Sequence, residues 1–300
     1  MRNLDALLIF ARVAELASFT RASESLGIQK ARASATVREL EAEVGARLLH
    51  RTTRSVQLTE DGRAFYSRAR DLLAEIDELH AMFSVDGVSL QGRLRVDLPT
   101  EMARNPILPA LPQWMAANPR VELEISSTDR RVDLVQEGFD CVLRLGPIVD
   151  ETLLARSLGR LRMINAASPH YLARHGTPHS LDDLRSQGHK MVHYTPTLGS
   201  KPFGWEHPVA NGYAVLQLPG AVQVNNVQTY HAAGLAGIGL IQAGHSALAP
   251  HIERGELVEV LPDLRPEPLA VSLVVAHRRN LSRRVLAFMN WIEGLLAPYT

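Results

Sequence analysis

The first 45 residues carry apolar positions at helical spacing, which predicts a small group of helices. Helical spacing of Leu4, Leu7, Leu8, Ala11 and Ala14 predicts an amphipathic first helix over residues 3–16. Ser18-Phe19-Thr20 interrupts that helix, and Thr20 can cap a second, short helix that runs through Leu26. Gly27 then supplies a turn, so a third helix follows closely.

The third helix has two faces of different character, and Gly45 closes it. The apolar stripe repeats at i, i+4, i+7 and i+11 and consists of Ala33, Val37, Leu40 and Val44. The opposite face consists of Lys30, Arg32, Ser34, Ala35 and Arg38. Small residues let a helix approach a groove of DNA, and arginine and serine contact phosphates and base edges. Two helices around a glycine-containing turn, the second with such a face, are typical of the helix-turn-helix motif.

A basic turn, Arg51-Thr52-Thr53-Arg54, comes next, between two short strands that residues 47–58 predict. A wing of this kind would lie beside a duplex and contact its backbone or minor groove. A solvated hairpin tip is the alternative. The position of the turn directly after the third helix favours the wing.

Residues 59–62 start a long helix, with Glu60 and Asp61 in the first turn, where the helix dipole favours acidic side chains. Apolar residues follow at alternating spacings of four and three: Phe65, Ala69, Leu72, Ile76, Leu79 and Phe83. This heptad seam predicts that the helix pairs with a second copy of itself. Packing of the seam onto its own chain is the alternative. A symmetric dimer would present two third helices to a two-fold-symmetric DNA site.

From Arg93 onward strands alternate with helices, which predicts a parallel α/β sheet. Strands are expected at 94–98, 121–125 and 141–145, with a helix over 129–138. Ligand sites in such sheets lie at the carboxyl ends of strands, beside helix N-termini. The residues at these ends are Thr100, Thr128 and Gly146. A hydroxyl at such a position can equally be a plain helix cap.

A second lobe is expected between about residues 165 and 267, after which the chain returns and ends in a helix over 282–296. Within this lobe Ser180 caps a short helix, Thr195 ends a strand, and Asn226 begins a helix. Two lobes that the chain crosses twice predict a hinged cleft with a small ligand at the interface. Helix N-termini favour an anionic ligand. The negative charge of Glu101, beside Thr100, would repel an anion, so a neutral or cationic effector is the alternative.

Composition adds class and charge to this pattern. Of 300 residues, 46% are hydrophobic and 21% are charged, which excludes a disordered or collagen-like chain and predicts two or three domains. The net charge is zero, yet residues 1–70 hold twelve basic and eight acidic side chains, so this head is +4 and the rest −4. The asymmetry favours a nucleic-acid-binding head on a larger body. A general preference for arginine is the alternative, because the chain has three lysines.

The sequence lacks the residue patterns of disulfides, metal sites and catalytic centres. Cys141 is the single cysteine, which excludes an internal disulfide, and its apolar strand predicts a buried, unreactive thiol. His189 and His193 lie on strand-like sequence, too far apart to share a metal ion. No cofactor loop or nucleophile–base motif points to an enzyme. Without a secretory signal or an apolar run of membrane length, the sequence predicts a cytoplasmic protein with no metal or cofactor.

The order of these elements resembles that of LysR-type transcriptional regulators. The resemblance rests on LDALLIFARVAELASFTRASESLGI and RASATVRELEAEVGARLLHRTTRSVQLTEDGRAFYSRAR, and later on AAGLAGIGLIQ and GELVEVLPDL; it extends to about residue 297. It implies an α/β protein with a winged helix-turn-helix over 1–62, a dimerising linker helix over 63–91 and an effector-binding domain over 92–300. That two-lobed domain would resemble a periplasmic binding protein, with lobe I at about 92–164 and 267–300 and lobe II at about 165–266.

The resemblance also implies partners and site residues. The partners are an operator in double-stranded DNA, a small-molecule effector and other copies of the chain, as a dimer or tetramer. The residues expected to contact DNA are Thr20, Gln29, Lys30, Ala31, Arg32, Ser34, Ala35, Arg38, Arg51, Thr52, Thr53 and Arg54. The residues expected to meet the effector are Thr100, Glu101, Thr128, Gly146, Thr195, Asn226 and Val227.

One departure from the family pattern lies at the start of the third helix, where Gln29 replaces the usual capping serine. Glutamine caps helices poorly, and Gln29, Lys30 and Arg32 can each reach a base edge. The preferred operator can therefore differ from the family's usual T–N11–A pattern. A solute-binding protein without a DNA role, and an enzyme that uses the cleft, are the competing classes.

Overall fold

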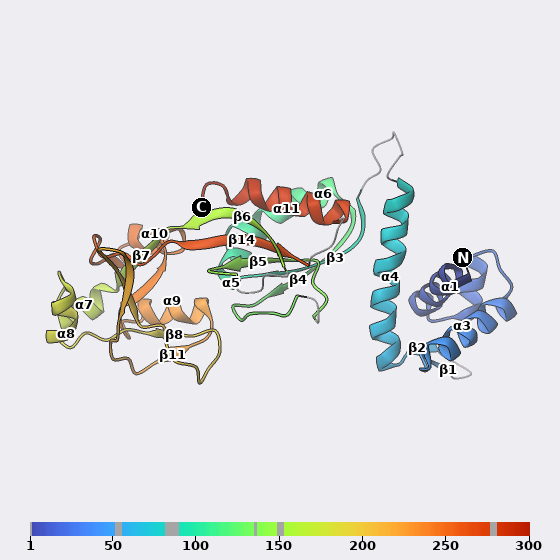
Figure 1. Ribbon diagram of the computed structural model, residues 1–300, viewed down its shortest axis with the longest axis horizontal. Helices are drawn as coiled ribbons and strands as arrows, with labels where there is room; N and C mark the ends of the chain where they lie inside the picture. The colour runs from blue at the N-terminus through green and yellow to red at the C-terminus, as the bar shows by residue number, and fades with distance from the viewer. Residues whose placement is uncertain (1, 52–55, 82–89, 135–136, 149–152, 277–280) are drawn as a thin grey trace. The chain divides into compact units, whose positions relative to one another are not determined.

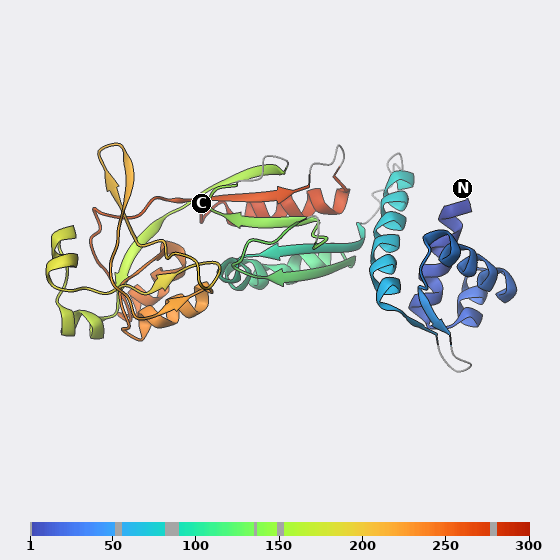
Figure 2. The same cartoon turned by 60° about the horizontal axis from the view of Figure 1, so that its bottom comes forward.

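A computed structural model describes residues 2–51, 56–81, 90–134, 137–148, 153–276 and 281–300. Contacts divide the chain into a first unit, chiefly residues 1–93, and a second unit, chiefly residues 94–300. Figures 1 and 2 show the elements of each unit from two directions. Within the described ranges no helix is both long and apolar enough to cross a membrane.

The first unit begins with the three helices that the apolar spacing predicts. They are α1 (Arg2–Leu16), α2 (Phe19–Ser25) and α3 (Lys30–Val44). The predicted Thr20 cap is wrong. Ser18 caps α2 instead, because its backbone is extended and its hydroxyl accepts a hydrogen bond from the amide of Arg21. Thr20 lies inside the helix.

Burial on α1 falls only partly on the apolar residues from which the sequence predicts the helix, of which Ala11 is buried. Phe10 and Val13 are buried in the core of the first unit, whereas Leu4 and Leu8 are 40% and 42% exposed. Both sets of apolar residues recur at helical spacing, so periodicity does not distinguish between them. The choice is made by α3, whose buried Val37 belongs to the same core as Phe10.

On α3 the predicted apolar stripe is buried from Ala33 to Leu40. Val44 is an exception at 42% exposure, because it lies in an open groove that Phe65 and Arg68 also line. Gly45 ends the helix as predicted, in the left-handed conformation with φ of 74°.

Two short antiparallel strands and a long helix complete the first unit, as predicted. They are β1 (Leu49–Arg51), β2 (Val56–Leu58) and α4 (Glu60–Ala81). Residues 52–55, which connect the strands, lie outside the described residues. Thr59 caps α4, because its hydroxyl accepts a hydrogen bond from the amide of Gly62 at 2.8 Å.

Lobe I of the second unit is built on a five-stranded sheet in the order β4-β3-β5-β14-β6. Its strands are β3 (Gln91–Leu98), β4 (Arg120–Ser127), β5 (Cys141–Leu145), β6 (Leu154–Leu161) and β14 (Leu269–Val275). Strands β3 and β5 are parallel, while β14 is antiparallel to both β5 and β6. The prediction of a parallel sheet is therefore wrong. The sheet is mixed, because β14 enters it in the opposite direction when the chain returns from lobe II.

The helices of lobe I come from both ends of the second unit. They are α5 (Thr100–Met102), the π-helical segment η1 (Ala103–Ile107), α6 (Leu108–Ala117) and α11 (Arg283–Leu296). Helices α6 and α11 lie side by side (Figure 1), and Trp114 of α6 packs edge-on against Phe288 of α11 with ring centroids 5.5 Å apart. The last helix of the chain therefore packs into the core of lobe I together with α6.

The segment after β4 is a loop, although the sequence predicts a helix over residues 129–138. Its described residues, 129–134 and 137–138, are irregular. Arg144 donates hydrogen bonds to the carbonyls of Arg130 and Val132, at 3.1 and 3.2 Å. Those carbonyls would accept hydrogen bonds within a helix, so their use by Arg144 stabilises the open loop.

Lobe II consists of small sheets with helices packed on them. Its strands are β7 (Met163–Ala167), β8 (His193–Tyr194), β9 (Trp205–Val209), β10 (Gly212–Leu216), β11 (Gln223–Val224), β12 (Ile241–Gly244) and β13 (Val258–Glu259). They form the sheets β12-β7-β13, β8-β11 and β9-β10. The helices are α7 (Pro169–His175), α8 (Leu181–Ser186), α9 (Val227–Leu235) and α10 (His245–Glu253). The chain enters lobe II after β6 and leaves it after β13.

The caps predicted in lobe II are confirmed. Ser180 and Asn226 accept hydrogen bonds from the amides of Asp183 and Thr229, at 3.1 Å in both cases. The β9–β10 hairpin and α10 were not predicted. Short strands with few alternating positions and a helix interrupted by Pro250 give weak periodic signals.

Candidate functional site

The outer face of α3 is exposed except at Ser34 and Ala35, which are half-buried. Lys30, Ala31, Arg32 and Arg38 are exposed, and the Nε of Arg38 donates a hydrogen bond to the Ser34 carbonyl at 3.3 Å. This face is basic because the buried apolar residues of α3, Ala33, Val37 and Leu40, are turned to the core on its other side. The helix therefore presents cationic donors without a competing acidic residue in its first turn.

The start of α3 has the weak cap that the sequence predicts. Gln29 is exposed and extended, and its side chain makes no capping hydrogen bond. The first amides of α3 and the Gln29 amide group can therefore face an outside partner. Phosphate oxygens satisfy helix N-terminal amides well.

The wing is held at both stems by side chains of the first unit. The Glu41 carboxylate of α3 accepts hydrogen bonds from the amides of Leu48 and Leu49, at 2.9 and 3.0 Å. At the other stem the Thr59 hydroxyl donates to the Arg47 carbonyl at 2.6 Å. These bonds fix the strands of the wing beside the end of α3.

The residues predicted at the wing tip are only partly described. Arg51 lies on β1 opposite Val56, and Thr52, Thr53 and Arg54 lie outside the described residues.

The predicted seam of α4 divides into two parts. Phe65 packs edge-on against Phe10 of the same chain, with ring centroids 5.5 Å apart, and Ala69 is buried. Leu72 and Leu79 are 49% and 57% exposed. The first turns therefore pack within their own unit, which was the alternative, while an apolar row remains exposed farther along. Ile76 is half-buried on this row, and Phe83 lies outside the described residues.

In the second unit, one carboxylate joins the two lobes. Asp129, in the loop after β4, accepts hydrogen bonds from the amide and hydroxyl of Thr100 in lobe I, at 2.9 and 2.8 Å. Its Oδ2 also accepts from the amide of Val227, the first residue of α9 in lobe II, at 2.7 Å. These residues form the centre of what we call the interlobe junction.

A second set of contacts lies beside it. Gln228 of α9 donates a short hydrogen bond to the Glu101 carboxylate and accepts one from Arg104 at 2.7 Å. The Nδ1 of His231 is 3.8 Å from the same Glu101 carboxylate. Burial lowers the pKa of His231 to about 4, so this histidine is neutral near neutral pH and the contact is not an ion pair.

The effector residues expected from the sequence reach different places. Thr100, Glu101 and Val227 meet at the interlobe junction, beside the Asn226 cap. The Thr128 hydroxyl is turned to Asp97 inside lobe I. Thr195 is buried within lobe II, where its hydroxyl donates to the Thr197 carbonyl at 3.0 Å. Gly146 directly follows β5 with φ of 87°, and a Cβ at this position would have nothing within 4 Å.

Sequence reasoning missed Asp129, Arg104, Gln228 and His231. Only Asp129 carried a usable signal, since it directly follows a predicted strand end. The partners of the other three lie more than a hundred positions away in the sequence or depend on the packing of α9.

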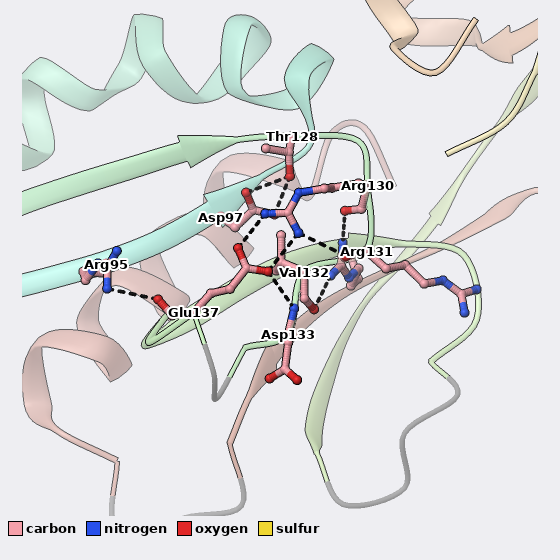
Figure 3. A network of polar contacts seen from close by, with 9 residues as sticks. Arg95, Asp97, Thr128, Arg130, Arg131, Val132, Asp133 and Glu137 are labelled. Atoms are coloured by element: carbon pink, nitrogen blue, oxygen red, sulfur yellow. Dashed lines mark hydrogen bonds and ion pairs between the residues drawn. The ribbon is translucent and has the colours of Figure 1, made fainter. Parts of the chain in front are cut away.

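A polar network braces the loop that carries Asp129 (Figure 3). Arg130 forms a two-pronged ion pair with Glu137, at 2.8 and 2.5 Å, and this pairing lowers the pKa of Glu137 to about 2. The fully buried Asp97 of β3 accepts from the Thr128 hydroxyl at 3.1 Å. With the bonds from Arg144, the residues on both sides of Asp129 are tied to the sheet.

The remaining candidate chemistry is structural. Cys141 is buried as predicted, and burial raises the pKa of its thiol to about 12, which makes it unreactive. His189 is also buried, with its Nδ1 3.2 Å from the Tyr171 hydroxyl. In the part of the chain that the structure describes, no three acidic, histidine or cysteine side chains are grouped to hold a metal ion.

Two family descriptions match the chain. Residues 4–63 match the bacterial regulatory helix-turn-helix protein of the lysR family, and residues 88–297 match the LysR substrate binding domain. The chain belongs to the LysR family of transcriptional regulators. The resemblance seen in the sequence is confirmed, and with it the fold class and the function of a DNA-binding regulator with an effector-binding domain.

Known proteins similar to this LysR-family regulator span its whole length. It is 44% identical to the HTH-type transcriptional regulator YhjC of Escherichia coli K12, over 100% of this chain and 99% of YhjC. It is 37% identical to an HTH-type transcriptional repressor of Pseudomonas aeruginosa, over 99% and 93%. Among solved structures, the LysR-type regulator CrgA of Neisseria meningitidis is similar with a TM-score of 0.61 and 28% identity, over 97% and 98%.

Proposed function

We propose that α3 reads base edges in the major groove of an operator while the wing contacts the DNA backbone. The observation that carries this proposal is the exposed face of α3, with Lys30, Arg32 and Arg38, braced by Glu41 against the stem of the wing. Cations on a helix of groove-fitting width supply both phosphate attraction and base recognition. We propose as DNA contacts all twelve residues that the sequence predicts, from Thr20 to Arg54.

The operator is two-fold symmetric, because α4 pairs two chains through its exposed row at Leu72, Ile76 and Leu79. Burial of these exposed apolar side chains against the same row of a second copy removes apolar surface from water, which favours pairing. Two dimers associate into a tetramer. The protein acts in the cytoplasm, where its DNA target lies, without catalysing a reaction and without a metal or cofactor.

The effector binds between lobes I and II, at the interlobe junction. The Asp129 and Glu101 carboxylates accept hydrogen bonds from Val227 and Gln228 across the lobes there, so a ligand at this place contacts both lobes at once. Such a ligand regulates by binding one arrangement of the lobes more tightly than another. The domain boundaries expected from the sequence, near residues 62 and 91, are part of this proposal.

The first experiment is selection of genomic DNA fragments by the purified full-length protein, across a salt series from about 50 to 200 mM. We expect one enriched, two-fold-symmetric sequence whose affinity falls steeply with salt. Binding that is equal on all fragments would contradict sequence-specific recognition by α3.

Three variants separate the roles of wing and helix. Arg51→Ala is expected to weaken binding to every sequence and to reduce the salt slope by about one. Arg32→Ala is expected to cost about 1–3 kcal/mol on the selected site and to change the preferred sequence. Lys201→Ala, at an exposed position of lobe II, is the control and leaves both properties unchanged. Equal loss on specific and random DNA for Arg32→Ala would contradict its assignment to a base edge.

A further inference from the structure

The Asp129 carboxylate occupies a position that is built for an anion. Three donors converge on it: the amide and hydroxyl of Thr100, and the amide of Val227. Thr100 follows the carboxyl end of β3, and Val227 opens the nine-residue helix α9. Strand ends and helix N-termini are the places where α/β proteins bind anionic ligands. Here the anion is a side chain of the protein itself.

The loop around Asp129 is held by bonds that do not involve Asp129. Thr128 is bonded to Asp97, and Arg130 is paired with Glu137 (Figure 3). Arg144 adds a hydrogen bond to the Arg130 carbonyl. The carboxylate is therefore positioned before the lobes meet, which reduces the entropy lost when it bonds to α9.

The charges around this position disfavour a second anion. Glu101, the neighbour of Thr100, places another carboxylate at the junction, and His231 beside it is neutral near neutral pH. The Asp129 charge also reaches lobe II: burial, with Asp129 as a further cause, raises the pKa of Tyr194 to about 12. A ligand carboxylate would have to displace Asp129 and would still face Glu101.

The same junction offers acceptors and a buried nitrogen. The Nε2 of His231 is buried and has no hydrogen-bond partner among the described residues, and the residue is 7% exposed. Buried polar atoms are normally bonded, so a ligand that reaches this nitrogen would gain a hydrogen bond. With Glu101 and Asp129 as acceptors, the junction suits a ligand that carries hydrogen-bond donors.

We propose that Asp129 determines the effector class, by filling the anion position of the interlobe junction from within the chain. The wild-type protein therefore excludes carboxylate effectors and selects a neutral or cationic effector rich in hydrogen-bond donors. This inference rests on the proposed effector function of the junction. It adds Asp129 as the residue that sets specificity there.

Acetate tests the proposal directly, because it carries the carboxylate that Asp129→Gly removes. In Asp129→Gly we expect acetate to bind with a roughly millimolar Kd, to raise the thermal midpoint saturably and to slow hydrogen exchange of the Val227 amide about tenfold. Acetamide, of the same shape without the charge, should have no such effect at equal ionic strength. Wild type and the control Asp263→Gly, at an exposed loop position, should not respond to acetate.

A second variant keeps the size of the side chain and changes its charge. Asp129→Asn is expected to speed exchange of the Val227 amide several-fold relative to wild type, because a neutral oxygen accepts a weaker hydrogen bond than a carboxylate. Acetate should not reverse this, since asparagine still fills the position. This variant tests the bond even if Asp129→Gly does not fold.

The proposal is overturned if acetate affects wild type and Asp129→Gly alike, or if acetamide has the same effect on Asp129→Gly as acetate. It is also overturned if Asp129→Gly folds and does not respond to acetate. Unchanged exchange in Asp129→Asn overturns it as well. Each readout is made without DNA. A failure here with a specific operator still recovered would reject the specificity inference alone, whereas failure of operator selection would reject the regulator proposal.

Discussion

Burial of a single histidine couples the stability of this protein to pH. His231 lies on α9 against Glu101, and burial lowers its pKa from the ordinary 6.5 to about 4, with His251 as a further cause and Asp129 opposing. Between these values the unfolded chain binds a proton at this residue that the folded chain does not. The free energy of unfolding therefore falls as the pH falls through this window.

We expect His231 to account for a loss of about 2 kcal/mol in the free energy of unfolding between about pH 7 and about pH 5. His231→Gln removes the titrating group, so the variant should show a smaller pH dependence by that amount. Urea unfolding at the two pH values measures the difference. His170→Gln, at an exposed position of α7, is the control. Identical pH dependence in wild type and His231→Gln would contradict the burial argument.

Residue-scale interpretation of the sequence succeeded where the cause is local. Asn226, Ser180 and Thr59 cap the helices that follow them, because a capping hydroxyl or carboxamide bonds to an amide three residues on. The error at Thr20 has the same origin: Ser18 is an equally good cap two residues earlier. Local rules name candidate caps, and the path of the backbone selects among them.

At the scale of elements, the wing and α4 meet through a glycine. A Cβ at Gly62, in the first turn of α4, would lie 1.9 Å from the Leu48 carbonyl oxygen. That distance is far inside van der Waals contact, so the backbone of α4 can approach the wing stem only without a side chain here. No signal in the sequence distinguished Gly62 from an ordinary helical glycine.

Gly62→Ala is expected to destabilise the first unit by about 3 kcal/mol, because either α4 or the stem of the wing must move. Gly294→Ala is the matched control: Gly294 is exposed in α11 with nothing within 4 Å of its Cβ position. That substitution should stabilise by up to about 1 kcal/mol through helix propensity. Thermal unfolding of both variants gives the comparison, and equal effects would refute the contact.

The exposed apolar row on α4 predicts that a charge placed on it disrupts the dimer. Leu72→Asp places a charge where a partner helix would bury Leu72, so the dimer should dissociate. Mass in solution by light scattering should halve or fall further. Leu198→Asp changes a leucine of lobe II that is more exposed than Leu72 and should leave the mass unchanged. A wild-type mass in Leu72→Asp would show that α4 does not hold the chains together.

At the scale of the whole molecule, each unit buries its own core. Phe10 is fully buried among the helices of the first unit, and Phe288 is fully buried against Trp114 in the second. No residue is shared between the described core of the first unit and those of the second. Two separate unfolding transitions are therefore expected.

Phe10→Ala and Phe288→Ala should each destabilise one transition by about 3–5 kcal/mol and leave the other unchanged. The reason is the cavity that each truncation leaves in a core of close-packed side chains. Differential scanning calorimetry of the two variants resolves the transitions. A shift of both transitions by either substitution would mean that the units unfold as one.

The sequence alone determined the properties that depend on near neighbours: three helices before a short antiparallel wing, the caps of α8, α9 and α4, and the family that their order indicates. It did not determine which apolar face α1 buries, because two faces satisfy the same period and α3 selects between them. Nor did it determine the mixed order of the sheet, since β14 returns from another lobe. Asp129 and Val227 are 98 positions apart. Only the packing of the two lobes brings a loop carboxylate to a helix amide, and periodicity carries no information across that distance.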